Sequence, residues 1–193
     1  MKTALIACGA LAREVIALNE KHAWGAEVWA VPALLHNRPE GIPAAVQGRI
    51  REARQSFDRV VVVYGDCGTG GQLDALLEAE GVQRLAGPHC FEMYAGDRFD
   101  RWMAEELGTF FLTDYLVSQF DQLVISELGL DRFPQLRDDY FAHYTRAVYL
   151  AQRSDPVLRA KAERAAQALN LPLEIKQVGY GALESRLLNL MQA

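Results

Sequence analysis

Three cysteines are the residues of this chain best suited to chemistry: Cys8, Cys67 and Cys90. Each follows a short apolar run that predicts a buried strand, and each lies close to a glycine or a proline. The carboxyl ends of parallel strands meet at one edge of a sheet, which is where open α/β folds bind ligands. We therefore expect the three thiols to lie on the same rim, provided that their strands are neighbours.

Three thiolates around one open coordination position suit two kinds of metal centre. One is a 4Fe–4S cluster whose fourth iron stays open for a substrate, and the other is a thiolate-rich zinc ion with an exchangeable ligand. His89 or Asp66 can supply a fourth ligand. The local spacing matches no standard zinc or ferredoxin motif, so two other interpretations stay open. These are a thiol-based catalytic site without metal and ordinary packing of small buried cysteines.

A glycine-rich loop between the valine-rich strand at residues 58–64 and the next helix is a second candidate site. Its backbone N–H groups, together with the helix dipole, favour an anion. The candidate anion-binding residues are Gly68, Thr69, Gly70 and Gly71. The loop is neither the dinucleotide fingerprint nor a P-loop, and a tight turn that needs glycines explains the same pattern.

Other polar residues near these turns are candidates for acid–base or binding roles. Asp66, His89 and Glu92 flank two of the cysteines and are candidate catalytic groups. Arg38 follows the second predicted strand, beside His36, and is a candidate to hold a carboxylate or phosphate. Helix capping and solvation are the alternative explanations for these side chains.

Strand and helix patterns alternate over residues 1–97 and again over 146–193. This alternation predicts a Rossmann-like α/β fold, with a mainly parallel sheet flanked by helices. Residues 98–145 are rich in aromatic side chains and predict a helical insertion that serves as core, lid or homo-oligomer surface. We therefore expect a single α/β domain over residues 1–193.

Composition excludes several classes of protein. Half of the residues are hydrophobic and 23% are charged, which excludes intrinsic disorder. The net charge of −5 and the lack of a basic run argue against nucleic acid as a partner. No apolar stretch reaches the roughly 20 residues that span a membrane. The odd number of cysteines and the lack of an export signal predict reduced thiols and a cytoplasmic protein.

Several short motifs together resemble one bacterial and archaeal family, known as domain of unknown function 1638. The motifs are Ala7–Leu11, Leu35–Pro39, Asp66–Gly71, His89–Cys90 with Glu92, and Gly108–Phe110 with Thr113–Asp114. Similar proteins are often encoded near corrinoid-dependent methyltransferases for methylated amines and betaines. The resemblance therefore implies a link to one-carbon methyl transfer and contact with a corrinoid, but it assigns no catalytic residue.

The leading hypothesis is a cytoplasmic metalloprotein with an iron–sulfur cluster or zinc on the three cysteines. Its partner would be a small anionic substrate or a corrinoid protein, in corrinoid-linked methyl metabolism. A second hypothesis is a non-enzymatic accessory protein that docks onto a methyltransferase. A third is a metal-free enzyme for an anionic metabolite, with Cys67 or Cys90 as the nucleophile.

Overall fold

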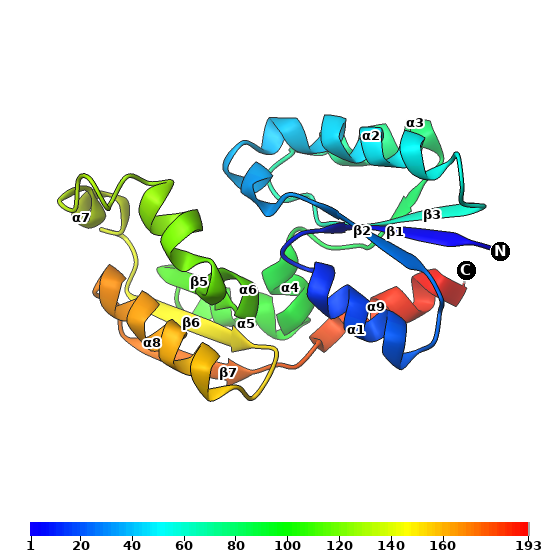
Figure 1. Cartoon of the computed structure of the whole chain (residues 1–193). Coiled ribbons are helices and arrows are strands. Elements are labelled where there is room, and N and C mark those ends of the chain that lie inside the picture. The colour runs from blue at the N-terminus through cyan, green and yellow to red at the C-terminus, as the bar shows by residue number, and fades with distance from the viewer. Residues whose placement is uncertain (193) are drawn as a thin grey trace. The chain divides into compact units, whose positions relative to one another are not determined.

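The computed structural model describes residues 1–192 and divides the chain into two compact units (Figure 1). The first unit comprises Met1–Met93 together with the chain from Ala182 onward, and the second comprises Tyr94–Gly181. Each unit has its own sheet, and every strand pairing in both sheets is parallel. The predicted Rossmann-like α/β fold is confirmed, whereas the assignment of the chain to a single domain stays a prediction.

A four-stranded sheet forms the centre of the first unit. Its strands are β1 (Thr3–Cys8), β2 (Glu27–Val31), β3 (Arg59–Val63) and β4 (Gln83–Arg84), in the order β2-β1-β3-β4. Its helical segments are α1 (Ala12–Lys21), η1 (Ala33–Asn37), η2 (Pro39–Gly41), α2 (Ile42–Ala53), α3 (Gln72–Glu80), α4 (Cys90–Ala95), which runs into the second unit, and α9 (Gly181–Gln192). Figure 1 shows α2 and α3 along one face of this sheet and α1 and α9 along the other.

Coverage on both faces explains the apolar strands of this sheet. All six residues of β1 are buried, as are the last three residues of β3. A strand that is covered on both faces has no polar side, so it shows a continuous apolar run in place of alternation. The sequence predicted β1 and β3 from this property, and the structure confirms both strands.

The second unit has a three-stranded sheet in the order β5-β6-β7. Its strands are β5 (Thr109–Thr113), β6 (Arg146–Ala151) and β7 (Leu173–Gln177). Its helical segments are α5 (Arg98–Glu105), α6 (Asp114–Ser118), the π-helical turn η3 (Asp121–Ser126), α7 (Leu136–Tyr140) and α8 (Pro156–Leu169). Helices α6 and α8 pack against each other over a core that includes Leu112, Tyr149 and Ala162.

The prediction that residues 98–145 form a helical insertion is wrong in one respect, because this region contains strand β5. The strand has the sequence Thr-Phe-Phe-Leu-Thr, and it pairs with β6 as an edge strand of the second sheet. A short apolar run of this kind is ambiguous between a buried strand and a buried helix by periodicity alone. Its threonines and aromatic residues, which favour strands, were the signal that distinguishes the two.

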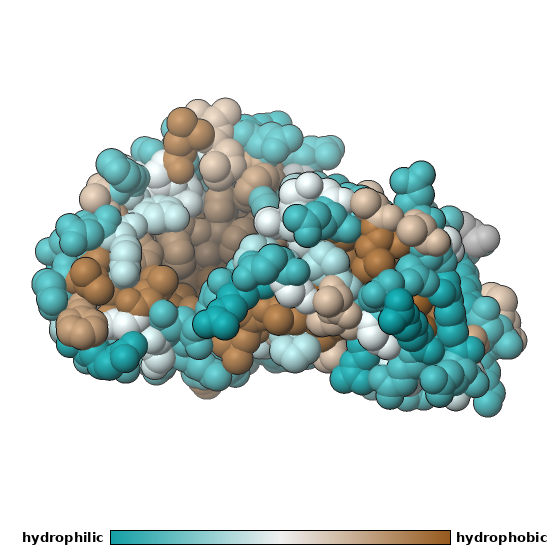
Figure 2. All heavy atoms as spheres, turned by 90° about the horizontal axis from the view of Figure 1, so that it is seen from above, coloured by the Kyte–Doolittle hydropathy of each residue, from teal (hydrophilic) through white to brown (hydrophobic). Residues whose placement is uncertain are grey.

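The surface mixes charged and apolar side chains, and Figure 2 shows brown hydrophobic residues that interrupt the hydrophilic ones on the face drawn. Large exposed apolar side chains include Leu107, Phe133 and Val157. Among the residues that the structure describes, no helix has the length and apolar character needed to cross a membrane.

Candidate functional site

The order of strands in the first sheet brings the three cysteines to the same edge. Strand β1 lies beside β3, and β3 lies beside β4. Cys8 ends β1, Cys67 lies in the loop after β3, and Cys90 begins α4 after β4. The condition on which the sequence argument depended, that these strands are neighbours, is therefore met.

Backbone contacts hold the loops of Cys67 and Cys90 together. The Cys67 N–H donates to the carbonyl of Pro88 at 2.8 Å, and the Asp66 N–H donates to that of Gly87 at 3.3 Å. Gly65 packs so tightly that a Cβ there would lie 2.8 Å from the Cα of His89 and 2.8 Å from the Pro88 carbonyl oxygen. Real side chains do not tolerate such distances, so the close approach of the two loops requires glycine at residue 65.

His36 lies beside Cys8, on the short helix η1 that follows β2. Its Nε2 atom is 3.8 Å from the Cys8 sulfur, and its Nδ1 atom is 2.7 Å from the carbonyl oxygen of Ala33. The ring also stacks on Tyr64, with centroids 5.7 Å apart and planes 13° from parallel. Burial lowers the pKa of His36, so the ring is neutral at pH 7. The sequence analysis did not name His36 as a ligand, although its position just after a strand was the available signal.

Burial also controls the protonation of the thiols. It raises the pKa of Cys8 to about 11 and that of Cys67 to about 12. The pKa of Cys90 is raised well above its usual range by burial and then by the nearby Cys8 and Cys67. Cys8 therefore affects the ionisation of both other thiols. Without a cation beside them the three cysteines are thiols, whereas an activated nucleophile needs a lowered pKa.

The Tyr64 hydroxyl is buried in the same place. Tyr64 follows β3 and is 0% exposed. Its hydroxyl lies beside the Cys8 thiol, but among the described residues no hydrogen bond of good geometry satisfies it. Burial raises its pKa first, and Cys8, Cys67 and Cys90 add to the rise. An unsatisfied buried hydroxyl costs about 1–3 kcal/mol, so this one marks a place where a further polar or charged group would be stabilising.

The cysteines are close together but do not form a finished metal site. Within residues 1–192, no three Cys, His, Asp or Glu side chains form a group that is already arranged to hold a metal ion. A metal that binds all three sulfurs would therefore have to turn their side chains toward a common centre.

The Asp66 carboxylate accepts hydrogen bonds from donor groups of the glycine-rich loop. The donors are the Thr69 hydroxyl at 2.6 Å, the Gly71 N–H at 2.9 Å and the Gly70 N–H at 3.3 Å. The Thr69 hydroxyl and the Gly71 and Gly70 N–H groups hold the pKa of Asp66 below its usual range. The backbone N–H groups that an anion would need at Gly70 and Gly71 are thus already bound by the protein's own carboxylate.

Replacing Asp66 by alanine is expected to lower the free energy of unfolding by about 1 kcal/mol, the usual net value of a side-chain hydrogen bond. The contribution of Asp66 should be complete above about pH 4, the ordinary aspartate pKa, and should disappear as the pH falls through the lowered folded-state pKa. Urea unfolding of the wild type and of Asp66→Ala at pH 7 and pH 3 measures the difference in their free energies of unfolding. An equal difference at the two pH values would contradict the assignment.

The other predicted catalytic residues have structural partners. Glu92 forms a two-pronged ion pair with Arg186 of α9, at 2.6 and 2.5 Å. The Nδ1 atom of His89 accepts a hydrogen bond from the Glu92 N–H at 3.3 Å, within the first turn of α4. Arg38 is exposed at the end of η1. The structure therefore gives Glu92 and His89 structural roles, and their catalytic roles stay predictions.

The second unit contains a buried polar network that the sequence analysis did not propose as a site. Asp114, 1% exposed, begins α6 at the carboxyl end of β5. Its carboxylate accepts hydrogen bonds from the Tyr149 hydroxyl at 2.6 Å and the Gln152 N–H at 3.0 Å, and it pairs with Arg153 at 3.2 Å. An aspartate directly after an apolar run was the signal that would have revealed this network.

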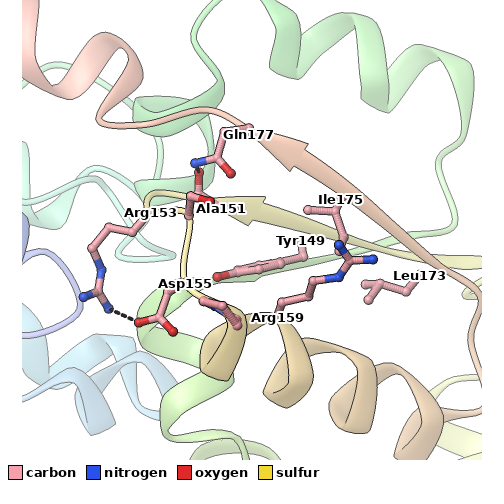
Figure 3. A pocket seen from close by; sticks show the side chains of 10 residues that line it. Tyr149, Ala151, Arg153, Asp155, Arg159, Leu173, Ile175 and Gln177 are labelled. Carbon is pink, nitrogen blue, oxygen red and sulfur yellow. Dashed lines mark hydrogen bonds and ion pairs between the residues drawn. The ribbon is translucent and has the colours of Figure 1, made fainter.

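A cavity of about 520 Å³ lies beside this network (Figure 3). Leu173 and Ile175 of β7 form an apolar wall, while Arg159 of α8 reaches across from the helix. Tyr149 lies at its floor, and Arg153 approaches Asp155 at 3.9 Å. Such a mixture suits a small molecule with both apolar and charged parts.

A family model described as a protein of unknown function, DUF1638, matches residues 30–187 of the chain. The match runs from the last two residues of β2 into α9, and so includes elements of both units. No curated protein and no solved structure matches the chain.

Proposed function

The chain belongs to the DUF1638 family of proteins of unknown function, and we propose that it binds a soft metal centre through Cys8, Cys67 and Cys90. The observation that carries the proposal is the meeting of the three thiols at adjacent strand ends, around the unsatisfied hydroxyl of Tyr64. Cys8 raises the cost of ionising both Cys67 and Cys90, so a cation among them would stabilise the thiolates together.

The donor set restricts the metal. Thiolate ligands select zinc, copper(I) and iron–sulfur clusters over the hard cations magnesium and calcium. An N–H···S contact also supports a thiolate at Cys8, because the backbone N–H of Ala10 lies 3.4 Å from its sulfur. Zinc and a 4Fe–4S cluster are the two centres that the proposal admits.

The biological setting rests on the resemblance to this family alone. Thiolate-bound zinc activates a thiol for alkyl transfer, and a cluster delivers electrons or acts as a Lewis acid. Either chemistry fits one-carbon methyl metabolism with a corrinoid protein as the partner. Free thiols also fit a reducing compartment, so we place the protein in the cytoplasm.

The other two hypotheses receive less support. A metal-free enzyme with a cysteine nucleophile requires a lowered thiol pKa, and burial raises the pKa of all three cysteines. A non-enzymatic accessory protein is compatible with the same metal site, and it differs only in lacking turnover of its own.

The test is purification without oxygen, followed by measurement of iron, zinc and acid-labile sulfide per chain. We expect one zinc ion or one cluster per chain in the wild type. The metal content should fall to less than about one-tenth of that value after Cys8→Ser, Cys67→Ser or Cys90→Ser, since all three thiolates are needed to hold the metal.

Val31→Ala is the matched control, because Val31 is buried at the same sheet edge, at the end of β2, and carries no ligand atom. It should keep its metal despite a loss of stability. Full metal content in all three serine variants, or a wild type without metal whose thiols all remain free, would overturn the proposal.

A further inference from the structure

We propose that His36 is the fourth ligand of the centre on Cys8, Cys67 and Cys90, which makes it a tetrahedral zinc site of three cysteines and one histidine. This inference rests on the proposed function. Of the two centres that the proposed function admits, zinc and a 4Fe–4S cluster, it selects zinc. Its strongest support is the placement of the ligands, because every strand of the first sheet contributes one at its carboxyl end. His36 follows β2, Cys8 ends β1, Cys67 follows β3 and Cys90 follows β4.

The hydrogen bond of the ring fixes which nitrogen is available. The Ala33 carbonyl oxygen can only accept, so the proton that joins it to the ring must be on Nδ1, 2.7 Å away. In the neutral ring, Nε2 then carries a lone pair, and Nε2 is the atom that lies near the Cys8 sulfur. Zinc-binding histidines are oriented in this way, with the other ring N–H held by a carbonyl or carboxylate.

The distance between the two ligand atoms fits one shared ion. Zinc bonds of about 2.3 Å to sulfur and about 2.0 Å to nitrogen, at a tetrahedral angle, place the two atoms about 3.5 Å apart. The observed separation of the Cys8 sulfur and His36 Nε2 is 3.8 Å, so these two atoms need only a small shift to share one ion. Ligands that bind different irons of a cluster are held farther apart, and this separation therefore favours zinc.

Packing holds the ring in this position. His36 stacks on the fully buried ring of Tyr64, which itself follows β3 between the cysteine-bearing loops. The two fourth ligands predicted from the sequence are otherwise engaged. Asp66 accepts three hydrogen bonds from its own loop, and Nδ1 of His89 accepts one from Glu92.

The test uses the full chain, emptied of metal under reducing conditions and titrated with zinc(II) against a chromophoric chelator and with cobalt(II) by visible absorption. We expect the wild type to bind one equivalent, with the intense visible bands of tetrahedral cobalt. His36→Ala should weaken zinc binding by about 100-fold or more, since loss of an outer-shell partner alone costs about 10–100-fold. His36→Cys should restore binding, with cobalt bands shifted toward those of a four-thiolate site.

His22→Ala is the matched control, because His22 is a part-buried histidine of the same unit that pairs with Glu184 and lies outside the proposed site, and it should bind zinc like the wild type. Thermal unfolding of each metal-free variant shows that it folds. If His36→Ala and His36→Cys bind zinc and cobalt as the wild type does, the inference is overturned while the three-cysteine proposal stands. If the wild type takes up iron and sulfide and no zinc, the zinc assignment is overturned. If it takes up no metal, both proposals fail.

Discussion

Replacing Asp114 by alanine is expected to lower the free energy of unfolding by about 2–6 kcal/mol, because it leaves two buried donors without their acceptor at about 1–3 kcal/mol each. The substitution removes the acceptor of the Tyr149 hydroxyl and of the Gln152 N–H, both of which lie in buried residues. It also removes one of the two carboxylates that pair with the Arg153 guanidinium, and the other is Asp155. Urea unfolding monitored by circular dichroism, with the slope m checked for constancy, measures the loss.

Asp114→Asn is the informative companion, because it removes the charge but keeps one oxygen acceptor. It should cost less than alanine, and Tyr149→Phe should cost about 1–3 kcal/mol, the usual penalty for a lost buried hydrogen bond. Coupling between the Asp114 and Tyr149 substitutions should appear as non-additivity in the double variant. A loss below about 1 kcal/mol for Asp114→Ala would mean that the network does not stabilise the second unit.

Gly65→Ala is expected to separate the two cysteine-bearing loops. The new Cβ would lie 2.8 Å from backbone atoms of Pro88 and His89, which cannot move aside as a flexible side chain does. Overpacking of this kind costs about 1–3 kcal/mol. The two loops would have to move apart, which would lengthen the hydrogen bond from the Cys67 N–H to the Pro88 carbonyl. We expect metal content to fall with stability, as measured by metal analysis and thermal unfolding.

Gly48→Ala is the matched control for this prediction. Gly48 lies on α2, is exposed, and would bring its Cβ within 4 Å of nothing. Alanine there should raise stability by about 0.5–1 kcal/mol, because it reduces the freedom of the unfolded chain and favours the helix. If Gly65→Ala proves as harmless as Gly48→Ala, the loop contact does not organise the cysteine site.

The regular elements of the chain were predictable because local patterns determine them. Strands β1 and β3 coincide with the apolar runs that predicted them. Strand β5 was missed because a short apolar run fits a buried strand or a buried helix by periodicity alone, and the run lies in a segment whose neighbouring parts are helical. With β5 in place, the second half of the chain forms a sheet of its own.

Part of the candidate site was likewise predictable from local patterns, and part of it was not. The positions of Cys8, Cys67 and Cys90 at predicted strand ends, and the rule that parallel strands end at one edge, placed three thiols on one rim from sequence alone. The order of the strands, the approach of Gly65 to His89 and the burial of Tyr64 required the folded chain, because they join residues distant in sequence.

The sequence by itself determined the α/β class and the parallel strands, since these follow from side-chain type and periodicity, and it predicted Cys8, Cys67 and Cys90 at strand ends. Only the tertiary structure decided which groups meet. In the folded chain His36 lies beside Cys8, and the Asp66 carboxylate accepts a hydrogen bond from the Gly71 N–H of the glycine-rich loop. The buried Asp114 carboxylate accepts a hydrogen bond from the Tyr149 hydroxyl. The physical reason is that contact between distant segments depends on strand order and packing, which local patterns leave open.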